Sequence, residues 1–312
     1  MSETPPRICV VGSAMIDLIA RVPRLPVMGE TLVGSAFHQG FGGKGSNQAV
    51  MAARLGAAVT MVVKLGRDGF GESTLENYRR NGIDTQHVSF DDQRSSGVAP
   101  IAVDDEGHNS IIIVPGANDA LGPVDVERAA DAIRAARVVV CQCEVPDAAN
   151  ITAFRLARAA GATTILNPAP ARPLPPELLA LTDILTPNET EAALLTGLPV
   201  DTIEQAGQAA AKLRASGSRT VIITLGERGA LLLDDQGSAH VPSVAVRAVD
   251  STGAGDAFVG SLAFELASER EVRDALPRAA AIAALSVTAS GTQTSFPARA
   301  AADAFLAQHG LD

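Results

Sequence analysis

The chain has 312 residues, of which 46% are hydrophobic and 19% charged, so it can bury a large core and is too apolar to be disordered. Its formal net charge of -10 leaves no basic excess to meet a phosphate backbone, which argues against nucleic acid and anionic membranes as partners. The first residues lack the pattern of a signal peptide, and no stretch reaches the roughly 18 apolar residues of a membrane span, so we expect a cytoplasmic protein.

Cysteine and histidine are few and scattered. Cys9, Cys141 and Cys143 lie in apolar, strand-like runs, so we expect buried thiols rather than disulfides. The five histidines show no metal-ligand spacing, so no zinc site is predicted.

The first predicted element is the apolar run 8–12, which ends in glycine. This pattern is typical of a buried parallel strand whose carboxyl end opens into a ligand crevice. Asp17 follows just beyond that end. It is either a solvated loop residue or cap, or a ligand for a sugar hydroxyl, and its position leaves the two interpretations about equal.

Two β-rich insertions interrupt the α/β pattern. Residues 20–41 contain two prolines, two glycines before position 40 and short extended pieces such as 31–33, and residues 97–103 and 110–114 predict a hairpin. We interpret the insertions as a small β-sheet lid. The predicted division is an α/β domain made of 1–17, 42–96 and 116–312, with a lid made of 18–41 and 97–115.

A glycine-rich segment between the insertions leads into a predicted helix. Gly40, Gly42 and Gly45 match the dinucleotide-binding pattern by letter, but that pattern belongs on the first strand-to-helix turn, and the first predicted strand ends well before it. The segment is not a P-loop, because Lys44 is followed by glycine. Lys44 and Asn47 at this junction suit a polyhydroxylated ligand.

From about residue 124 onward, predicted helices alternate with predicted strands at 138–141, 163–166, 183–186 and 220–224. This alternation predicts an α/β fold with a mostly parallel central sheet between two layers of helices, and with ligands at the carboxyl ends of the strands. Single polar residues there could be helix caps, but several strand ends carry them: Glu144, Asn167, Asn188, Glu191, Thr224, Gly226 and Gly229.

Residues 248–258 predict the start of a helix with an anion site. Gly253, Ala254 and Gly255 precede an apolar run at roughly helical spacing, and the free N–H groups of a helix start attract anions. Asp256 lies in the same place. A lone acid there is often an ordinary first-turn residue, but the small residues before it allow a phosphate to approach the backbone.

Five segments, 42–49, 167–170, 188–191, 224–226 and 250–256, together resemble the ribokinase-like (pfkB-type) carbohydrate kinase family, in the same order and over essentially the whole chain. The resemblance implies a three-layer α/β/α domain with a β-lid, and transfer of the ATP γ-phosphate to the 5-hydroxyl of ribose. Phosphorylation of another pentose, a hexose or a nucleoside (deoxyribose, fructose, adenosine) is the alternative. Two more distant alternatives are a regulator that binds nucleotide and sugar without catalysis, and a dehydrogenase.

The resemblance also assigns roles to residues. Asp256 resembles the catalytic base, and Gly253, Ala254 and Gly255 resemble the anion hole. Sugar-binding positions are matched by Asp17, Gly43, Lys44, Asn47 and Glu144, while Met15 stands where many bacterial members carry a sugar-contacting Asn. Asn188 and Glu191 match an element that handles Mg²⁺ and phosphates, and Thr224, Gly226 and Gly229 match the nucleotide loop.

A monovalent-cation site and a dimer are further implications. The resemblance places K⁺ beside the anion hole, at Asp250, Thr252, Ser286, Ala289, Gly291 and Ser295. The lid's strand edges and apolar face need cover, which predicts a homodimer formed through the lid.

Overall fold

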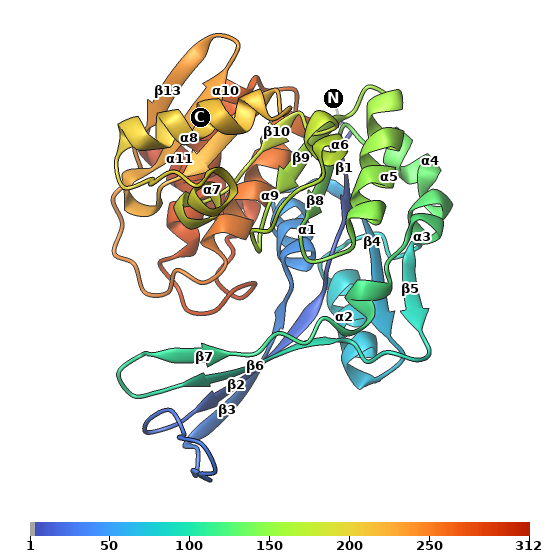
Figure 1. Ribbon diagram of the computed structural model, residues 1–312, viewed down its shortest axis with the longest axis vertical. Coiled ribbons are helices and arrows are strands. Elements are labelled where there is room, and N and C mark those ends of the chain that lie inside the picture. Colours follow the sequence, from blue (N-terminus) through green and yellow to red (C-terminus); the bar gives the residue numbers. More distant parts are fainter. Residues whose placement is uncertain (1–3) are drawn as a thin grey trace.

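The computed structural model describes residues 4–312, and within them the central feature is a nine-stranded sheet (Figure 1). In spatial order its strands are β13 (Gly237–Val241), β12 (Ala230–Asp234), β11 (Thr220–Thr224), β10 (Ile184–Leu185), β9 (Thr163–Asn167), β8 (Val138–Gln142), β1 (Arg7–Val11), β4 (Ala58–Gly66) and β5 (Val88–Asp91). The pairs from β11 to β5 are parallel, and only the pairs that join β12 to β11 and to β13 are antiparallel. The expected mostly parallel sheet is confirmed.

Alternate residues of each central strand face opposite layers of helices, which is why these strands are apolar throughout. In β1, Ile8 and Val10 pack into one core, whereas Cys9 and Val11 pack into the other. The first core is covered by α1 (Lys44–Arg54), α2 (Gly69–Arg80), α9 (Ala254–Ala267), α10 (Val272–Ser286) and α11 (Arg299–Gln308). The second is covered by α3 (Pro123–Arg128), α4 (Ala130–Ala135), α5 (Asp147–Ala159), α6 (Pro176–Ala180), α7 (Glu189–Thr196) and α8 (Ile203–Ala215).

Two short 3₁₀ turns, η1 (Gly116–Ala120) and η2 (Gly226–Arg228), complete the pattern. The cysteines are buried and free, as expected. Among the helices of residues 4–312, none has both the length and the apolar content needed to cross a bilayer.

A second sheet projects from the end of the molecule at which β1 and β4 finish (Figure 1). This lid sheet has the order β3 (Ala36–Gly42), β2 (Met15–Arg21), β6 (Gly97–Val103) and β7 (Asn109–Ile111). The hairpin predicted from the second insertion is present, although its return strand is shorter than 110–114. Residues 31–33, expected to be extended, lie outside any strand, because the register of β3 on β2 starts only at Ala36.

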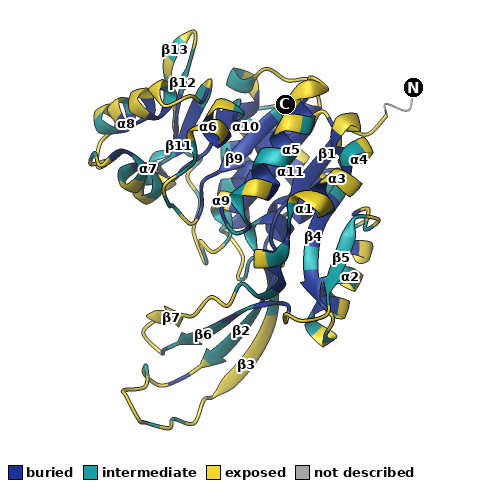
Figure 2. Cartoon of the chain, turned by 45° about the vertical axis from the view of Figure 1, so that its right-hand side comes forward, coloured by how far each residue is buried: buried dark blue, intermediate teal, exposed yellow. Residues whose placement is uncertain are grey.

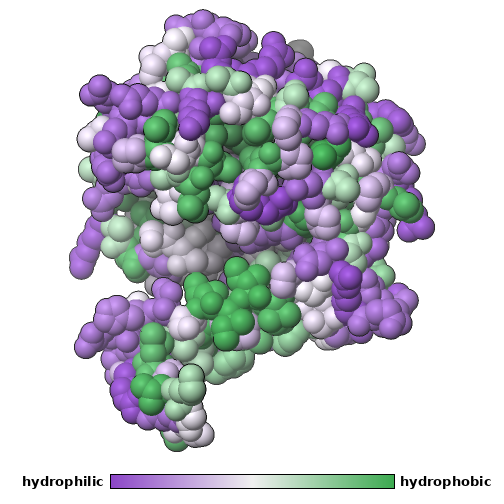
Figure 3. All heavy atoms as spheres, in the orientation of Figure 1, coloured by the Kyte–Doolittle hydropathy of each residue, from purple (hydrophilic) through white to green (hydrophobic). Residues whose placement is uncertain are grey.

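Much of the lid sheet is exposed, and Figure 2 shows exposure along β3. Exposed apolar side chains gather on it and at its junction with the larger sheet (Figure 3). They include Val33, which is 88% exposed, Phe37, which is 63% exposed, and the consecutive residues 111–114. Phe37 lies on the edge strand β3, and residues 111–114 lie at or after the opposite edge strand β7, so apolar groups are exposed at both edges of the sheet.

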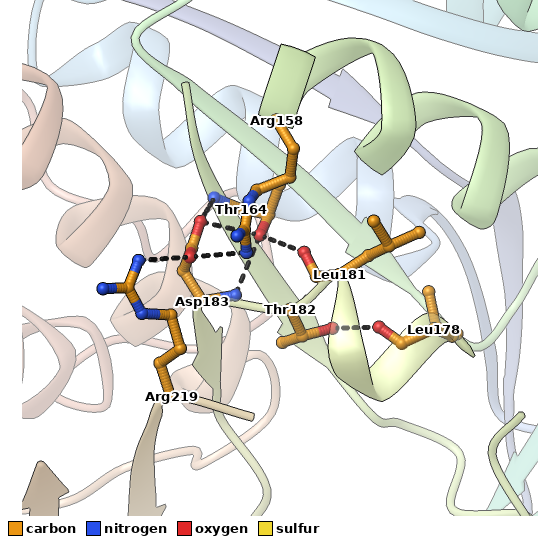
Figure 4. Close-up of polar contacts among 7 residues, drawn as sticks. All are labelled: Arg158, Thr164, Leu178, Leu181, Thr182, Asp183 and Arg219. Atoms are coloured by element: carbon orange, nitrogen blue, oxygen red, sulfur yellow. Dashed lines mark hydrogen bonds and ion pairs between the residues drawn. The ribbon is translucent and has the colours of Figure 1, made fainter. Parts of the chain in front are cut away.

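The strand predicted at 183–186 is reduced to the two residues of β10, and at its start the N–H and side chain of Asp183 make other contacts. Its carboxylate accepts hydrogen bonds from both the N–H and the hydroxyl of Thr164 at 3.0 Å, and it pairs with Arg158 at 2.9 Å and Arg219 at 3.6 Å (Figure 4). Its own N–H donates to the Thr164 hydroxyl at 2.8 Å instead of to a neighbouring strand. This cluster fastens α5, β9, β10 and β11 at their junction.

Candidate active site

A cavity of about 160 Å³ lies at the carboxyl ends of β9, β10 and β11, next to the start of α9. We call it the central cavity. Its lining unites residues that are far apart in the sequence: Lys44, Asn167, Thr186, Asn188, Glu191, Thr224, Ser251, Gly253, Ala254, Gly255, Asp256, Phe258 and Val259. Four of the predicted strand-end residues, Asn167, Asn188, Glu191 and Thr224, therefore converge, as the rule for open parallel sheets requires, whereas Glu144, Gly226 and Gly229 lie outside this lining.

The start of α9 has the geometry expected of an anion site. Gly253 caps the helix with φ of 81°, a left-handed conformation that glycine adopts without strain, and a Cβ there would lie 2.5 Å from Cγ2 of Thr292. The N–H of Ala254 already donates to the Ser251 carbonyl at 3.2 Å. The first-turn N–H groups that follow point along the axis, where a helix start attracts negative charge.

Gly255 has a different reason to be glycine. A Cβ at this position would meet no protein atom within 4 Å, although the residue lines the central cavity. The fold does not require glycine there. The space that a methyl group would fill is therefore available to a ligand.

Asp256 is held by two neighbouring amides of α1. Asn47 donates from Nδ2 to Oδ2 at 2.9 Å, and Gln48 donates from Nε2 to Oδ1 at 2.9 Å. The carboxylate is 6% exposed, so both contacts operate away from water, where hydrogen bonds to a charged group are strong. Gln48 is itself held by Gln142, whose Nε2 donates to its Oε1 at 2.7 Å.

Strand β2 of the lid sheet brings Asp17 close to Glu144 and Asp256. A Cβ on Gly42 would lie 2.5 Å from Oδ1 of Asp17, and a Cβ on Gly43 would lie 2.7 Å from the N atom of Met15. Met15 is 5% exposed and pairs with Gly42 across β2 and β3. The glycines thus allow the strand that carries Asp17 to pass close to the start of α1.

Glu144 is anchored from the carboxyl end of β8. Its Oε2 accepts from the hydroxyl of Ser13 at 2.5 Å and from the N–H of Lys44 at 2.9 Å. Burial raises the pKa of Glu144, although the Lys44 ammonium opposes this effect. Burial, together with the carboxylates of Glu144 and Asp256, raises the pKa of Asp17 from its ordinary 3.8 to about 6.

Lys44 is the cation among these acids. Burial by itself lowers the pKa of Lys44, but the carboxylates of Asp256, Glu144 and Glu191 outweigh it and raise the pKa. The ammonium therefore stays charged at neutral pH.

Asn188 and Glu191 form a reciprocal cap at the start of α7. The N–H of Glu191 donates to Oδ1 of Asn188 at 2.8 Å, and the N–H of Asn188 donates to Oε2 of Glu191 at 2.9 Å. Burial raises the pKa of Glu191. Thr224 lies beside them, since it bridges Asn188 as a parallel neighbour.

The two glycines of the predicted nucleotide loop differ. Gly229 has φ of 89°, and a Cβ there would lie 2.0 Å from the Val241 carbonyl oxygen, so the backbone requires glycine. Gly226 has φ of 56° with open space around it. The space beside Gly226 is therefore open to a ligand.

The predicted cation residues are partly brought together. The carboxylate of Asp250 accepts from the N–H groups of Thr252 and Gly291, both at 2.9 Å. Burial alone would raise the pKa of Asp250, but these hydrogen bonds lower it. The hydroxyls of Ser286 and Ser295 instead donate to the carbonyls of Ala283 and Thr292, and Ala289 is exposed.

Gln48, Ser13 and Gln293 contact site residues but were not predicted. Gln293 donates to Oδ1 of Asn47 at 2.9 Å. The signal available for Gln48 was its place beside Asn47 near the start of a predicted helix. For Ser13 and Gln293 no local pattern marks the partner.

Fold and site together define an α/β protein with a lid sheet and a polar, acid-containing cavity beside a helix start. Residues 5–299 match the profile described as pfkB family carbohydrate kinase, and the chain belongs to that family.

Three relatives give the extent of the likeness. A ribokinase of Mus musculus is 45% identical over 300 residues, which are 95% of this chain and 93% of the relative. A deoxyribokinase of Salmonella typhi is 43% identical over 291 residues, 93% of this chain and 95% of the relative. A solved structure of Arabidopsis thaliana ribokinase complexed with ribose and ATP has a TM-score of 0.91 at 35% identity and covers 97% of this chain and 99% of its own.

Proposed function

We propose that this carbohydrate kinase transfers the γ-phosphate of ATP to the 5-hydroxyl of D-ribose, giving ribose 5-phosphate and ADP. The observation that carries the proposal is the position of Asp256, a carboxylate fixed by two amides at the wall of the central cavity and in the first turn of α9. A base here can orient the sugar hydroxyl and take its proton. The adjacent helix start can balance the charge that develops on the transferred phosphoryl group.

The sugar is assigned to the lid side of the cavity. Asp17, Glu144 and Asn47 offer acceptors and a donor for hydroxyl groups, and Lys44 together with the closely packed Gly43 completes the set. ATP is assigned to the other side, along Thr224 and Gly226, with its terminal phosphate at Gly255. We also propose the cytoplasm as the enzyme's compartment, since ATP is abundant there.

Magnesium fits the Asn188–Glu191 corner. Carboxylate and amide oxygens are the hard ligands that Mg²⁺ takes, and the ion is usually held by one or two carboxylates together with substrate phosphates. Bound with the phosphates, it would neutralise charge on their oxygens.

Potassium fits the contact between Asp250 and segment 286–295. The Asp250 carboxylate and backbone carbonyls of this small-residue segment suit a large, weakly held cation. Bound there, the ion adds rigidity to the loop before α9, which supports the anion hole.

We also propose that residues 18–41 and 97–115 form a lid that closes over the sugar, and that two lids pair in a homodimer. The exposed apolar side chains of the lid sheet and the unpaired edge of β3 support this assignment. Closure would exclude water and so prevent ATP hydrolysis.

A second candidate acceptor is 2-deoxyribose, favoured by Met15. A buried thioether beside the sugar side of the cavity offers no hydrogen bond to a hydroxyl, so one contact that distinguishes hydroxylated sugars is missing.

The experiment is a comparison of kcat/KM for ribose, 2-deoxyribose, fructose and adenosine, with ADP release coupled to an absorbance assay and the product's phosphorylated position read by NMR. Ribose is expected to give the highest value, and Asp256→Asn to keep ATP affinity while kcat falls roughly 10²–10⁴-fold. The same assay in K⁺ and in Na⁺ at equal ionic strength should be faster in K⁺. An acceptor that exceeds ribose by tenfold or more, or a fully active Asp256→Asn, would contradict the assignment.

A further inference from the structure

Gln293 extends from the segment 286–295 to α1, the helix that contacts the base, and to α2. Its side chain is buried, at 5% exposed. Nε2 donates to Oδ1 of Asn47 at 2.9 Å and to the hydroxyl of Ser46 at 3.1 Å, both on α1. Oε1 accepts from Nδ2 of Asn77, on α2, at 2.9 Å.

This contact and the carboxylate of Asp256, which only accepts hydrogen bonds, together determine which way the amide of Asn47 faces. An Asn side chain has one acceptor end and one donor end. Because Oδ1 is taken by Gln293, Nδ2 faces Oδ2 of Asp256, 2.9 Å away. With the amide turned by 180°, an oxygen would face the carboxylate and the hydrogen bond to Asp256 would be lost.

The order of donors therefore runs through three amides, from Asn77 to Gln293 to Asn47, and ends on the carboxylate of Asp256. Each contact pairs a donor with an acceptor, so a reversal at the far end creates a mismatched contact at Gln293, at Asn47 or at the base itself. The other oxygen of Asp256 is held through Gln48 and Gln142, which Gln293 does not contact.

The backbone of the segment is fixed to α1 as well. Arg54, the last residue of α1, donates from one Nη to the carbonyls of Gln293 and Phe296, both at 2.7 Å. Gln293 thus enters the cluster from a fixed anchor point. A change in the segment is passed on to Asn47 through the side chain of Gln293.

We propose that Gln293 is a positioning residue for phosphoryl transfer, which sets the orientation of the Asn47 amide and thereby aims Asp256. It also connects the base to the segment that contains the candidate cation residues Gly291 and Ser295. The inference rests on the proposed role of Asp256.

The first test compares Gln293→Glu with Gln293→Met. Glutamate keeps the shape and accepts from Asn77, but it cannot donate to Asn47, so the new carboxylate competes with Asp256 for the donor end of the Asn47 amide. Methionine removes the contact without adding a competitor. We expect kcat to fall by about tenfold in Gln293→Glu and by about threefold in Gln293→Met, while the KM for ATP stays within twofold of wild type.

The second test acts on the far end of the chain of amides. Asn77→Asp cannot donate to Oε1 of Gln293, so Gln293 should turn, present Oε1 to Asn47 and reverse it as well. We expect kcat to fall in the same direction, although residue 77 does not contact Asp256. Arg80→Gln is the matched control, because it changes the charge of the same helix by one unit and loses only an exposed pair with Glu76; its kcat should equal wild type.

A third readout does not require turnover. The side-chain amide protons of Asn47 in NMR spectra should shift in Gln293→Glu and in Asn77→Asp, and stay in place in Arg80→Gln. If Gln293→Glu keeps the kcat of wild type and its Asn47 signals do not shift, the proposal is overturned. It is also overturned if the losses of kcat among the variants are proportional to their losses of Tm. A wild-type protein that phosphorylates no acceptor would refute the proposed function instead, and the Asn47 signals would still decide the orientation.

Discussion

The side chain of Gln48 donates to Oδ1 of Asp256 at 2.9 Å, while its neighbour Asn47 donates to the other oxygen of the same carboxylate. Consecutive helical residues diverge by about 100°, so two of them reach one group only when it lies between their directions, beyond the helix surface. The carboxylate of Asp256 sits in that position. Its orientation is therefore set by α1 rather than by the helix on which it is carried.

Gln48→Met should reduce kcat by about tenfold or more, because a hydrogen bond to a charged group contributes roughly 1.5–3 kcal/mol and a tenfold change in rate is about 1.4 kcal/mol. The measurement is kcat at saturating sugar and ATP, with Tm recorded for both proteins. Full activity in Gln48→Met would show that Asn47 alone is sufficient to aim the base.

Gly255→Ala should separate activity from stability. A methyl group there meets no protein atom within 4 Å, and alanine is favoured over glycine in a helix by up to about 1 kcal/mol, so the variant should be as stable as wild type or more stable. The methyl group would occupy the phosphate space, so kcat/KM for ATP should fall by about 100-fold.

The matched control is Gly207→Ala, in the interior of α8, where a Cβ also meets nothing within 4 Å. It should gain similar stability at unchanged activity. Equal activity in both variants would remove Gly255 from the site.

Asp17 predicts two effects of pH. Its carboxyl titrates near 3.8 when unfolded and at about 6 in the fold, mainly because it is buried. Between these values the folded protein keeps a proton that the unfolded chain has lost, so the free energy of unfolding falls as pH rises through this window. Asp17→Asn should remove the part of that decrease that comes from Asp17 and be the more stable protein at pH 7. Glu144 and Glu191, whose pKa values burial also raises, still contribute in both proteins.

The same titration should appear in sugar binding, because a carboxylate accepts hydrogen bonds from hydroxyls and a protonated acid does so poorly. The KM for ribose should rise as pH falls below about 6, with no such rise in Asp17→Asn. A KM that is flat from pH 5 to 8 in wild type would exclude Asp17 from the sugar site.

Met15→Asn should raise the preference for ribose over 2-deoxyribose, expressed as the ratio of their kcat/KM values, by about tenfold. An amide at this buried position would hydrogen-bond a sugar hydroxyl and would be left unpaired when that hydroxyl is absent. A thioether distinguishes the two sugars much less. Both sugars are assayed with wild type and variant, which cancels effects on stability. An unchanged ratio would mean that residue 15 does not face the part of the sugar in which the two differ.

The lid sheet predicts association. Wild type should sediment as a dimer at micromolar concentration, and Phe37→Glu should sediment as a monomer with a higher KM for sugar, because a charge would be buried at the contact. Val124→Glu is the control, since Val124 is 59% exposed but lies on α3, outside the lid sheet. A monomeric wild type with full activity would contradict lid pairing.

The central sheet was predictable because parallel strands buried on both faces are short apolar runs, and 138–141 and 220–224 stand out between helical segments. The strand β3 was not, since its exposed residues lack both an apolar run and alternation. At 183–186, Asp183 uses its N–H for a side chain rather than for the sheet, and only the tertiary structure reveals this.

The site residues also divide into those that a local sequence pattern predicts and those that it does not. The small residues before Asp256 and the capping pair Asn188 and Glu191 carry local signatures, so the sequence was sufficient to single them out. Gln48 and Gln293 were missed because an amide can pair with almost any polar group. Its partner is decided by packing between segments that are distant in the chain.

The contacts of Arg54 and Asn47 with Gln293 join the first helix to a segment that is synthesised much later. Asn47 is separated from Gln293 by 246 positions and from Asp256 by 209. During translation, α1 leaves the ribosome early, but its Asn47 amide lacks the contact to Gln293 until the chain has been made as far as residue 293. A nascent chain that already carries Asp256 has the base and its two amide partners on α1, but not the contact that links Asn47 to segment 286–295. Partly synthesised molecules should therefore transfer phosphate more slowly than the complete chain, and full activity should come only when this last segment has packed on α1.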